Sequence, residues 1–200
     1  MRDQYQSVID ELINQRELEE NFEEIIDDLK NSKSLYLESW KKYKVCDLFA
    51  WADDKLLNNF DAAKVFKEYE VRTYKNREGN IKKDSSGIYV FWVDSKPAYI
   101  GRSHRLMRRI KDHVSCSNRN TSSFGHGISK LIYKHDNPKQ RIPKDILKTD
   151  KRCRDIVRNY IKSLEVSFYY VSPQQEERLY LLELYLSMRY RTVMNRFKPH

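Results

Sequence analysis

The stretch from Gly87 to His113 reads GIYVFWVDSKPAYIGRSHRLMRRIKDH. Two runs within it, Gly87–Asp94 and Ala98–Arg102, are rich in the β-branched and aromatic residues that favour strands. The Ser-Lys-Pro segment between them predicts a turn, so the two runs would form a β-hairpin. Such a hairpin would place Tyr89 and Tyr99 side by side.

A basic amphipathic helix is predicted directly after the hairpin, from Leu106 to about Val114. Leu106 and Ile110 fall on its apolar side. Another side carries polar residues four positions apart, namely Arg105, Arg109 and His113. The pattern predicts that two phenols, a guanidinium and an imidazole converge on one surface.

A third strand and a long helix are predicted near the end of the chain, at Val166–Val171 and from Gln174 to about Tyr190. The helix carries an apolar stripe of Leu179, Leu182, Leu186 and Met188, which Leu181 and Leu184 widen. Glu183 lies among these residues, and a carboxylate near a buried face is costly unless it is paired or binds a metal. The alternatives are a solvent-facing glutamate or a partner of Arg178 or Arg189.

This ordered set of residues resembles the GIY-YIG nuclease family. The resemblance covers roughly residues 85–200 and includes the hairpin, Arg109 ten residues after Tyr99, and His113 one helical turn later. The family also places a metal-binding glutamate and a later asparagine near the end of its domain, which Glu183 and Asn195 match. The family commonly has a proline three residues before the asparagine, where this chain has a threonine.

The resemblance implies a metal-dependent phosphodiester hydrolase. Tyr89 would act as general base toward the attacking water, and Tyr99 would orient the water or the phosphate. The other implied site residues are Arg109 for the charge on the phosphate, His113 for the proton relay, Glu183 for Mg²⁺ or Mn²⁺, Asn195 for support by hydrogen bonding, and Arg102 and Arg105 for phosphate binding. Each has a plainer alternative: the tyrosines as sheet residues, the histidine as a helix cap, the asparagine as a turn residue.

A tyrosine base needs a lowered pKa, since a free phenol titrates near pH 10. Nearby cations favour the phenolate, and the sequence predicts that Arg102, Arg105 and Arg109 lower the pKa of Tyr89.

Charge divides the 200 residues unevenly. Residues 1–70 contain 10 basic and 17 acidic residues, a net charge of −7, whereas residues 71–200 contain 28 and 12, a net charge of +16. The basic part is the predicted nucleic-acid surface, with double-stranded DNA as the expected partner. A plain basic face, or one that touches acidic membrane lipid, is the alternative for the charge alone.

Two domains are predicted, a helical N-terminal extension over residues 1–75 and the nuclease domain over residues 76–200, with the polar segment 76–86 at the boundary. Helices are predicted at residues 4–30, 35–44, 47–57 and 61–69, and a strand at residues 71–74 that would add to the sheet edge. The first helix has an acidic face, which is a solvated surface, an arm that competes with DNA, or a dimer contact through its apolar stripe.

The middle of the chain is predicted to be less regular. Residues 115–123 form a polar loop without core residues, and helices follow at residues 128–134 and 153–163. The basic stretch 138–154 between those helices is a candidate for groove contacts with DNA, or an exposed variable loop.

The sequence therefore predicts an α/β chain of the α+β type, with a small three-stranded antiparallel sheet flanked by helices. Its expected function is that of a cytoplasmic, divalent-metal-dependent DNA endonuclease of restriction or defence type, with a homodimer implied by resemblance. No membrane span, secretory segment or zinc-ligand spacing is found in the sequence. The alternatives are a non-catalytic nucleic-acid-binding module that retains the fold and an interaction protein that recruits a partner through its acidic helix.

Overall fold

The computed structural model describes residues 27–49, 51–52, 55–56, 65–66, 71–75, 79, 81–172, 178–192 and 194–195. The chain divides into two compact units, Met1–Ser39 and Trp40–His200. This division falls earlier than the predicted boundary after residue 75. The helix predicted at residues 4–30 lies outside the described residues, except for residues 27–31, which are helical.

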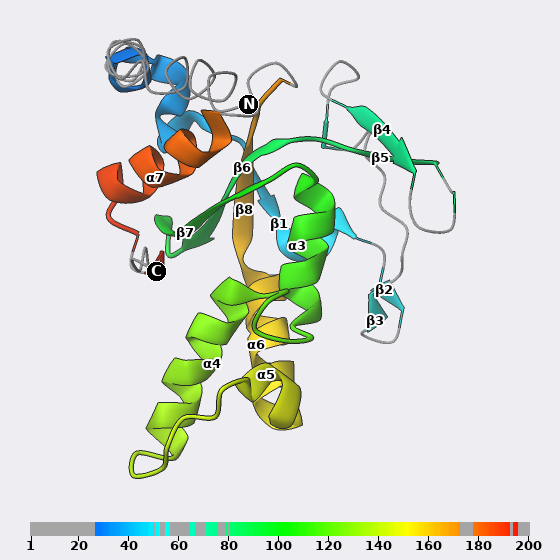
Figure 1. The fold of residues 1–200 in the computed structure, drawn as a ribbon, viewed down its shortest axis with the longest axis vertical. Coiled ribbons are helices and arrows are strands. Elements are labelled where there is room, and N and C mark those ends of the chain that lie inside the picture. The colour runs from blue at the N-terminus through cyan, green and yellow to red at the C-terminus, as the bar shows by residue number, and fades with distance from the viewer. Residues whose placement is uncertain are drawn as a thin grey trace, which may run out of the picture. The chain divides into compact units, whose positions relative to one another are not determined.

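The second unit contains a four-stranded antiparallel sheet with the strand order β1-β8-β6-β7 (Figure 1). The strands are β1 (Lys42–Lys44), β6 (Gly87–Val93), β7 (Lys96–Ser103) and β8 (Glu165–Tyr170). The predicted α+β class is confirmed, but the prediction of three strands is wrong. The fourth strand, β1, was predicted as the end of a helix; its Tyr43 ring instead packs 6.0 Å from that of Phe168 on β8.

The predicted hairpin is confirmed as β6 and β7. Its turn lies at Asp94 and Ser95, which both have positive φ angles, of 48° and 60°, as tight hairpins require. The prediction of a turn at residues 95–97 is therefore wrong, because Lys96 and Pro97 pair with β6. Tyr89 pairs with Gly101, and Phe91 pairs with Tyr99. The two tyrosines are therefore diagonal neighbours on one face of the sheet, with ring centroids 6.1 Å apart.

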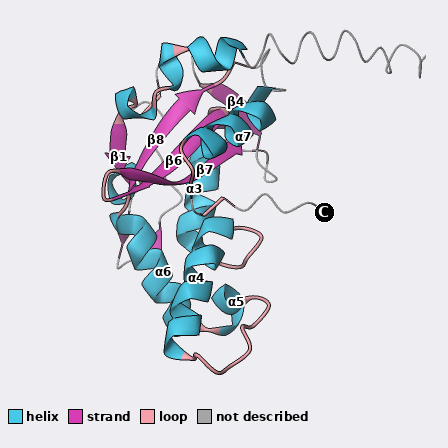
Figure 2. Cartoon of the chain, turned by 90° about the vertical axis from the view of Figure 1, so that its left-hand side faces the viewer, coloured by secondary structure: helices cyan, strands magenta, loops and turns pink. Residues whose placement is uncertain are grey.

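Helices cover the sheet on two sides. They are α3 (Leu106–Ser115), α4 (Ser123–Asp136), α5 (Ile146–Thr149), α6 (Lys151–Ser163) and α7 (Leu179–Arg189). The face that carries Tyr89, Phe91 and Tyr99 shares one apolar core with α3, α4 and α6. Figures 1 and 2 show α7 against β6 and β7 from the other side, where the alternate strand residues Ile88 and Ile100 are fully buried.

The predicted helices between residues 35 and 57 are wrong. Short 3₁₀ turns stand there instead, η1 (Lys33–Leu35), η2 (Leu37–Ser39) and η3 (Val45–Leu48), followed by the small ribbon of β2 (Trp51–Ala52) and β3 (Lys55–Leu56). At residues 42–44, pairing of β1 with β8 prevails over the helical spacing of the apolar residues. The helix predicted at residues 61–69 lies outside the described residues apart from Val65 and Phe66.

The strand predicted at residues 71–74 exists but does not extend the main sheet. It is β4 (Arg72–Lys75), and it pairs with β5 (Ile81–Asp84) in a separate two-stranded ribbon. The segment predicted as a polar boundary therefore contributes a strand of its own.

Three predictions about the core also need correction. Cys116 and Ser122 are fully buried, although the loop that carries them was predicted to lack core residues. Ile146 is fully buried on α5, within the stretch predicted to be a basic insertion. Leu184 and Met188 of α7 are exposed rather than buried.

The start of α3 is held by a carboxylate from the ribbon. Asp84, at the end of β5, accepts hydrogen bonds from the backbone amides of Ser85, Met107 and Arg108 at 2.8, 2.9 and 3.0 Å. Two of these amides belong to the first turn of α3 and have no acceptor within the helix. Burial raises the pKa of the Asp84 carboxyl, and the three amides oppose that shift. Asp84 therefore caps α3 and fixes it beside the hairpin.

We expect the Asp84→Ala variant to lower the free energy of unfolding by about 2–4 kcal/mol, because it leaves buried amides without an acceptor. Urea denaturation followed by circular dichroism measures the change. The matched control is Lys83→Ala, an exposed neighbour on the same strand, for which we expect a change within about 0.5 kcal/mol. Equal unfolding midpoints for Asp84→Ala and the unaltered chain would contradict the capping role.

Candidate active site

The hairpin and α3 bring three of the predicted site residues into direct contact. The Tyr89 hydroxyl lies 2.7 Å from Nε2 of His113, and Nε of Arg109 donates a hydrogen bond to the same hydroxyl over 3.3 Å. Arg109 and His113 are one helical turn apart on α3, so both side chains reach the sheet face that carries Tyr89.

Gly101 makes room for this arrangement. It is the register partner of Tyr89 on β7, and a Cβ atom added to Gly101 would overlap the phenol hydroxyl. The second glycine of the motif is therefore needed because the phenol lies directly against the backbone of the neighbouring strand.

His113 is fully buried among aromatic rings, with Phe91 and Tyr99 at centroid distances of 5.5 and 5.7 Å. Burial, with a smaller contribution from Arg109, holds the pKa of His113 well below its usual value, so the imidazole is neutral. The Ser122 hydroxyl donates to the His113 carbonyl, so its oxygen can accept from Nδ1–H, 3.4 Å away. In that tautomer Nε2 accepts a hydrogen bond from the Tyr89 hydroxyl.

Burial also dominates the titration of Tyr89, which is 1% exposed. It raises the pKa of the phenol well above its usual value, and the neighbouring Tyr99 and Glu183 add to this increase. Arg109 lowers the pKa of Tyr89, but not enough to compensate. The predicted lowering of this pKa by three arginines is therefore wrong, since desolvation outweighs the one guanidinium that contacts the hydroxyl.

The loop before α4 supplies contacts that the sequence did not indicate. The Thr121 carbonyl accepts a hydrogen bond from Nη1 of Arg109 at 3.1 Å. The Ser123 hydroxyl lies 3.0 Å from that of Tyr99 and accepts from Nη2 of Arg109 at 3.5 Å. A run of small polar residues predicts a loop, and only the three-dimensional contacts reveal its place in the site.

Glu183 pairs with the hairpin rather than with the arginines of its own helix. Its Oε2 atom lies 2.9 Å from Nε of Arg102 on β7, as an ion pair whose N–H bond is not aligned for a hydrogen bond. The Arg102 guanidinium also lies 3.3 Å from the centroid of the Tyr180 ring on α7. Burial raises the pKa of Glu183, whereas Arg102 and Arg109 lower it.

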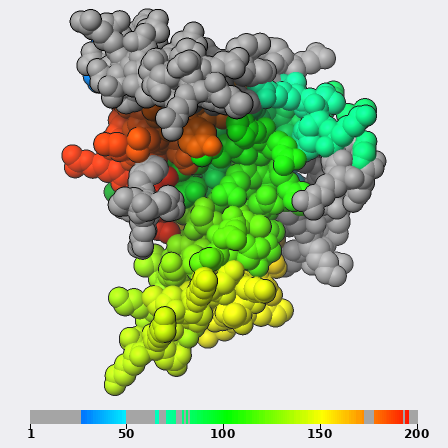
Figure 3. All heavy atoms as spheres, viewed as in Figure 1, coloured from blue at the N-terminus to red at the C-terminus, as the bar shows by residue number. Residues whose placement is uncertain are grey.

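The ion pair and the phenols lie on opposite faces of the sheet. Arg102 is the register partner of Ile88, and alternate residues of a strand point to opposite faces, so Arg102 projects away from the face of Tyr89 and Tyr99. Because β7 is an edge strand, the two groups of side chains can meet around that edge. The charge of Arg109 lowers the pKa of Glu183 by a small contribution. Figure 3 shows the orange surface of α7 beside a green surface, the colour of β7 and of the segment that follows it.

Asn195 acts on the backbone of the same edge strand. Its Oδ1 accepts from the amide of Ile100 at 2.8 Å, and its Nδ2 donates to the carbonyl of Ile100. The Thr192 hydroxyl donates to Asn195 Oδ1 at 2.9 Å. The threonine at the position where the resembled family commonly has proline therefore helps to orient the asparagine.

Arg105 lies apart from these contacts. Arg105 immediately precedes α3, and its guanidinium is 5.1 Å from the centroid of the Tyr74 ring on β4. The structure thus brings together Tyr89, Tyr99, Arg109 and His113, joins Glu183 to Arg102 at the edge of the sheet, and places Arg105 against the β4–β5 ribbon.

A divalent metal would have few protein ligands here. The described part of the chain contains no group of three or more His, Cys, Asp or Glu side chains suited to a metal ion. Glu183 has a side chain that is 21% exposed, and it fits a magnesium site in which one carboxylate is joined by waters and substrate phosphate oxygens.

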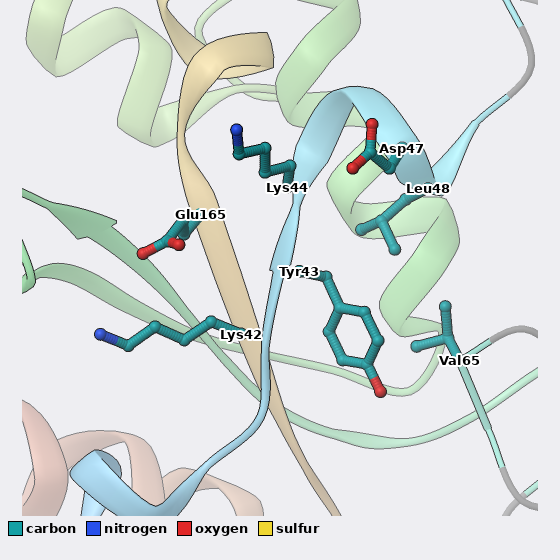
Figure 4. Close-up of a pocket in the computed structure, with 7 residues that line it drawn as sticks. All are labelled: Lys42, Tyr43, Lys44, Asp47, Leu48, Val65 and Glu165. Atoms are coloured by element: carbon teal, nitrogen blue, oxygen red, sulfur yellow. The ribbon is translucent and has the colours of Figure 1, made fainter.

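A separate pocket of about 420 Å³ lies at the opposite edge of the sheet. Figure 4 shows its lining, which includes Lys42 and Lys44 of β1, Glu165 of β8 and Asp47. None of the predicted site residues contributes to it.

Comparisons with known proteins do not add to this description: no protein-family model, curated protein or solved structure matches the chain. No helix among the described residues is long and apolar enough to cross a membrane.

We expect the free energy of unfolding to fall as the pH drops below about 6.5, the usual pKa of histidine. Below that pH His113 is protonated in the unfolded chain but stays neutral in the folded chain, where burial lowers its pKa. His113 contributes a loss in the free energy of unfolding of at most about 1.4 kcal/mol per pH unit. No further loss from this residue is expected below the pKa that it has in the folded chain. Chemical denaturation between pH 8 and pH 5 measures the slope.

The His113→Gln variant should show a shallower slope over this interval. The control is His135→Gln, since His135 is exposed on α4 and its replacement should leave the slope unchanged. If His113→Gln retained the full slope, the buried imidazole would not be its source.

Proposed function

We propose that this chain is a divalent-metal-dependent endonuclease that hydrolyses phosphodiester bonds in DNA. The observation that supports this most is the hydrogen-bonded set formed by Tyr89, His113 and Arg109. Its phenol oxygen accepts a hydrogen bond from the guanidinium, and the same hydroxyl lies 2.7 Å from a ring nitrogen of the neutral imidazole. A buried structural tyrosine also needs hydrogen-bond partners, but this phenol is paired with both an imidazole and a guanidinium. These two partners can supply the proton acceptor and the charge stabilisation that proton transfer from water to a buried base needs.

In this proposal Tyr89 and His113 work as one base. A phenol with a raised pKa holds its proton at neutral pH. The hydroxyl oxygen takes a proton from the attacking water while its own proton passes to Nε2 of His113, 2.7 Å away. No free phenolate has to be present beforehand. The cost of protonating buried His113 falls on the transition state, in which the phosphate gains negative charge.

Arg109 would bind the phosphate on which the water acts. Its guanidinium is permanently charged and forked, and it is held by Tyr89 and Thr121 on one side while remaining partly exposed. Because Tyr89 is buried beneath this group, water would reach the phenol past Arg109. Substrate binding and access to the base are therefore coupled in this proposal.

Glu183 would hold the metal ion, and Arg102 would keep that carboxylate ionised within a half-buried site. A bound Mg²⁺ or Mn²⁺ ion supplies Lewis-acid stabilisation to phosphate oxygens. The net charge of +16 over residues 71–200 supports a polyanionic substrate of the kind that the resemblance implies.

We expect the purified chain to nick supercoiled plasmid in Mg²⁺ and to lose that activity in EDTA. Glu183→Gln should lower the rate by about 100-fold or more, and Tyr89→Phe by about 100- to 10,000-fold, as expected for removal of a metal ligand and of a general base. Gel-resolved initial rates measure both changes.

Matched controls are Glu165→Gln, at the opposite edge of the sheet, and Tyr133→Phe, on the surface of α4; both should cut at the unaltered rate. Equal nicking by all four variants would assign the cutting to a contaminant. Salt-dependent binding of DNA without cleavage would instead favour a non-catalytic nucleic-acid-binding module.

A further inference from the structure

The segment Thr121–Ser123, which leads into α4, contacts three of the candidate catalytic side chains. The Thr121 carbonyl holds Arg109, the Ser122 hydroxyl lies near Nδ1 of His113, and the Ser123 hydroxyl lies between Tyr99 and Arg109. This concentration of contacts in three consecutive residues is not required to build the helix.

Ser122 already performs the local structural task. Its hydroxyl accepts a hydrogen bond from the amide of Gly125 at 3.2 Å and caps the start of α4. Ser122 is fully buried, whereas Ser123 is exposed at the first helical position. The Ser123 hydroxyl is therefore available for contacts other than capping.

Arg109 fixes the direction of one of the two hydrogen bonds at the Ser123 hydroxyl, and the bond to Tyr99 can run either way. The guanidinium of Arg109 can only donate, so the Ser123 oxygen accepts there. The single hydroxyl hydrogen of Ser123 is then free to be donated to the Tyr99 oxygen, 3.0 Å away. When Ser123 is the donor, Tyr99 keeps its own hydrogen for a further acceptor outside the protein, and Tyr99 is 9% exposed.

We propose that Ser123 is a positioning residue that relays the orientation of Arg109 to Tyr99, so that the Tyr99 O–H bond points at a non-bridging oxygen of the scissile phosphate. This inference rests on the proposed nuclease function and assigns Tyr99 the role of a hydrogen-bond donor to the substrate. The proposed series of hydrogen bonds runs from the Arg109 guanidinium through the hydroxyls of Ser123 and Tyr99 to the phosphate, and each donor in it has one acceptor.

The test compares Ser123→Ala with Ser123→Thr, alone and combined with Tyr99→Phe, in steady-state cleavage of a short labelled DNA duplex. We expect Ser123→Ala to lower kcat about tenfold with KM changed less than about threefold, because one hydrogen bond that matters in the transition state is lost. Ser123→Thr keeps the hydroxyl and should recover most of the rate. In the Tyr99→Phe background, Ser123→Ala should change kcat less than about twofold, because the relay then has no recipient.

Ser163→Ala, an exposed serine at the end of α6, is the control and should cut at the unaltered rate. An unchanged kcat for Ser123→Ala, or an equal loss with and without the Tyr99 hydroxyl, would overturn the inference while leaving the proposed nuclease intact. Absence of cleavage by the unaltered chain would overturn both proposals together, so the two failures are distinguishable.

Discussion

The arrangement of the candidate site depends on where the Arg109 guanidinium finds its acceptors. A cation taken partly out of water is costly unless each of its donors is matched. Arg109 meets a phenol oxygen through Nε, a backbone carbonyl through Nη1 and a serine hydroxyl through Nη2. These acceptors come from β6 and from the segment that leads into α4, so one side chain of α3 joins two segments that are more than 30 residues apart in the sequence.

Local patterns were sufficient to predict the hairpin and α3. The residues that favour strands and the four-residue spacing of a helix face can both be recognised within a few neighbouring residues. They failed where distant segments decide the outcome. Lys42–Lys44 becomes a strand only because β8 lies beside it, and Asp84 becomes a helix cap only because α3 begins next to it. The polar composition of the segment that contains Ser122 and Ser123 gives no sign that its residues are buried or contact the site. Ser122 is nevertheless fully buried.

The candidate site residues were therefore easier to predict than their chemistry. Sequence spacing brought Tyr89 together with Arg109 and His113, but the expected lowering of the tyrosine pKa had the wrong sign. Counting neighbouring cations measures only one contribution, and the cost of charging a phenol in a fully buried position exceeds it here. The same burial keeps the imidazole neutral and thus able to accept the phenol proton. The raised pKa of the tyrosine and the lowered pKa of the histidine have one cause, and together they keep both groups uncharged at neutral pH, which excludes a stored phenolate.

The edge position of β7 explains how groups on two faces of a sheet can serve one reaction. Tyr99 and Arg102 lie on the same strand but point to opposite faces, toward the phenol cluster and toward Glu183 respectively. On an interior strand, the neighbouring strands on both sides would keep the two side chains apart. An edge strand has one side without a neighbouring strand, and groups from both faces can meet there. Asn195 occupies part of that border by pairing with the backbone of Ile100, between Tyr99 and Gly101, which holds the strand in place without a further strand beside it. In the proposed function, this border is where a phosphodiester would reach both Glu183 and Arg109, which approach it from opposite faces of the sheet.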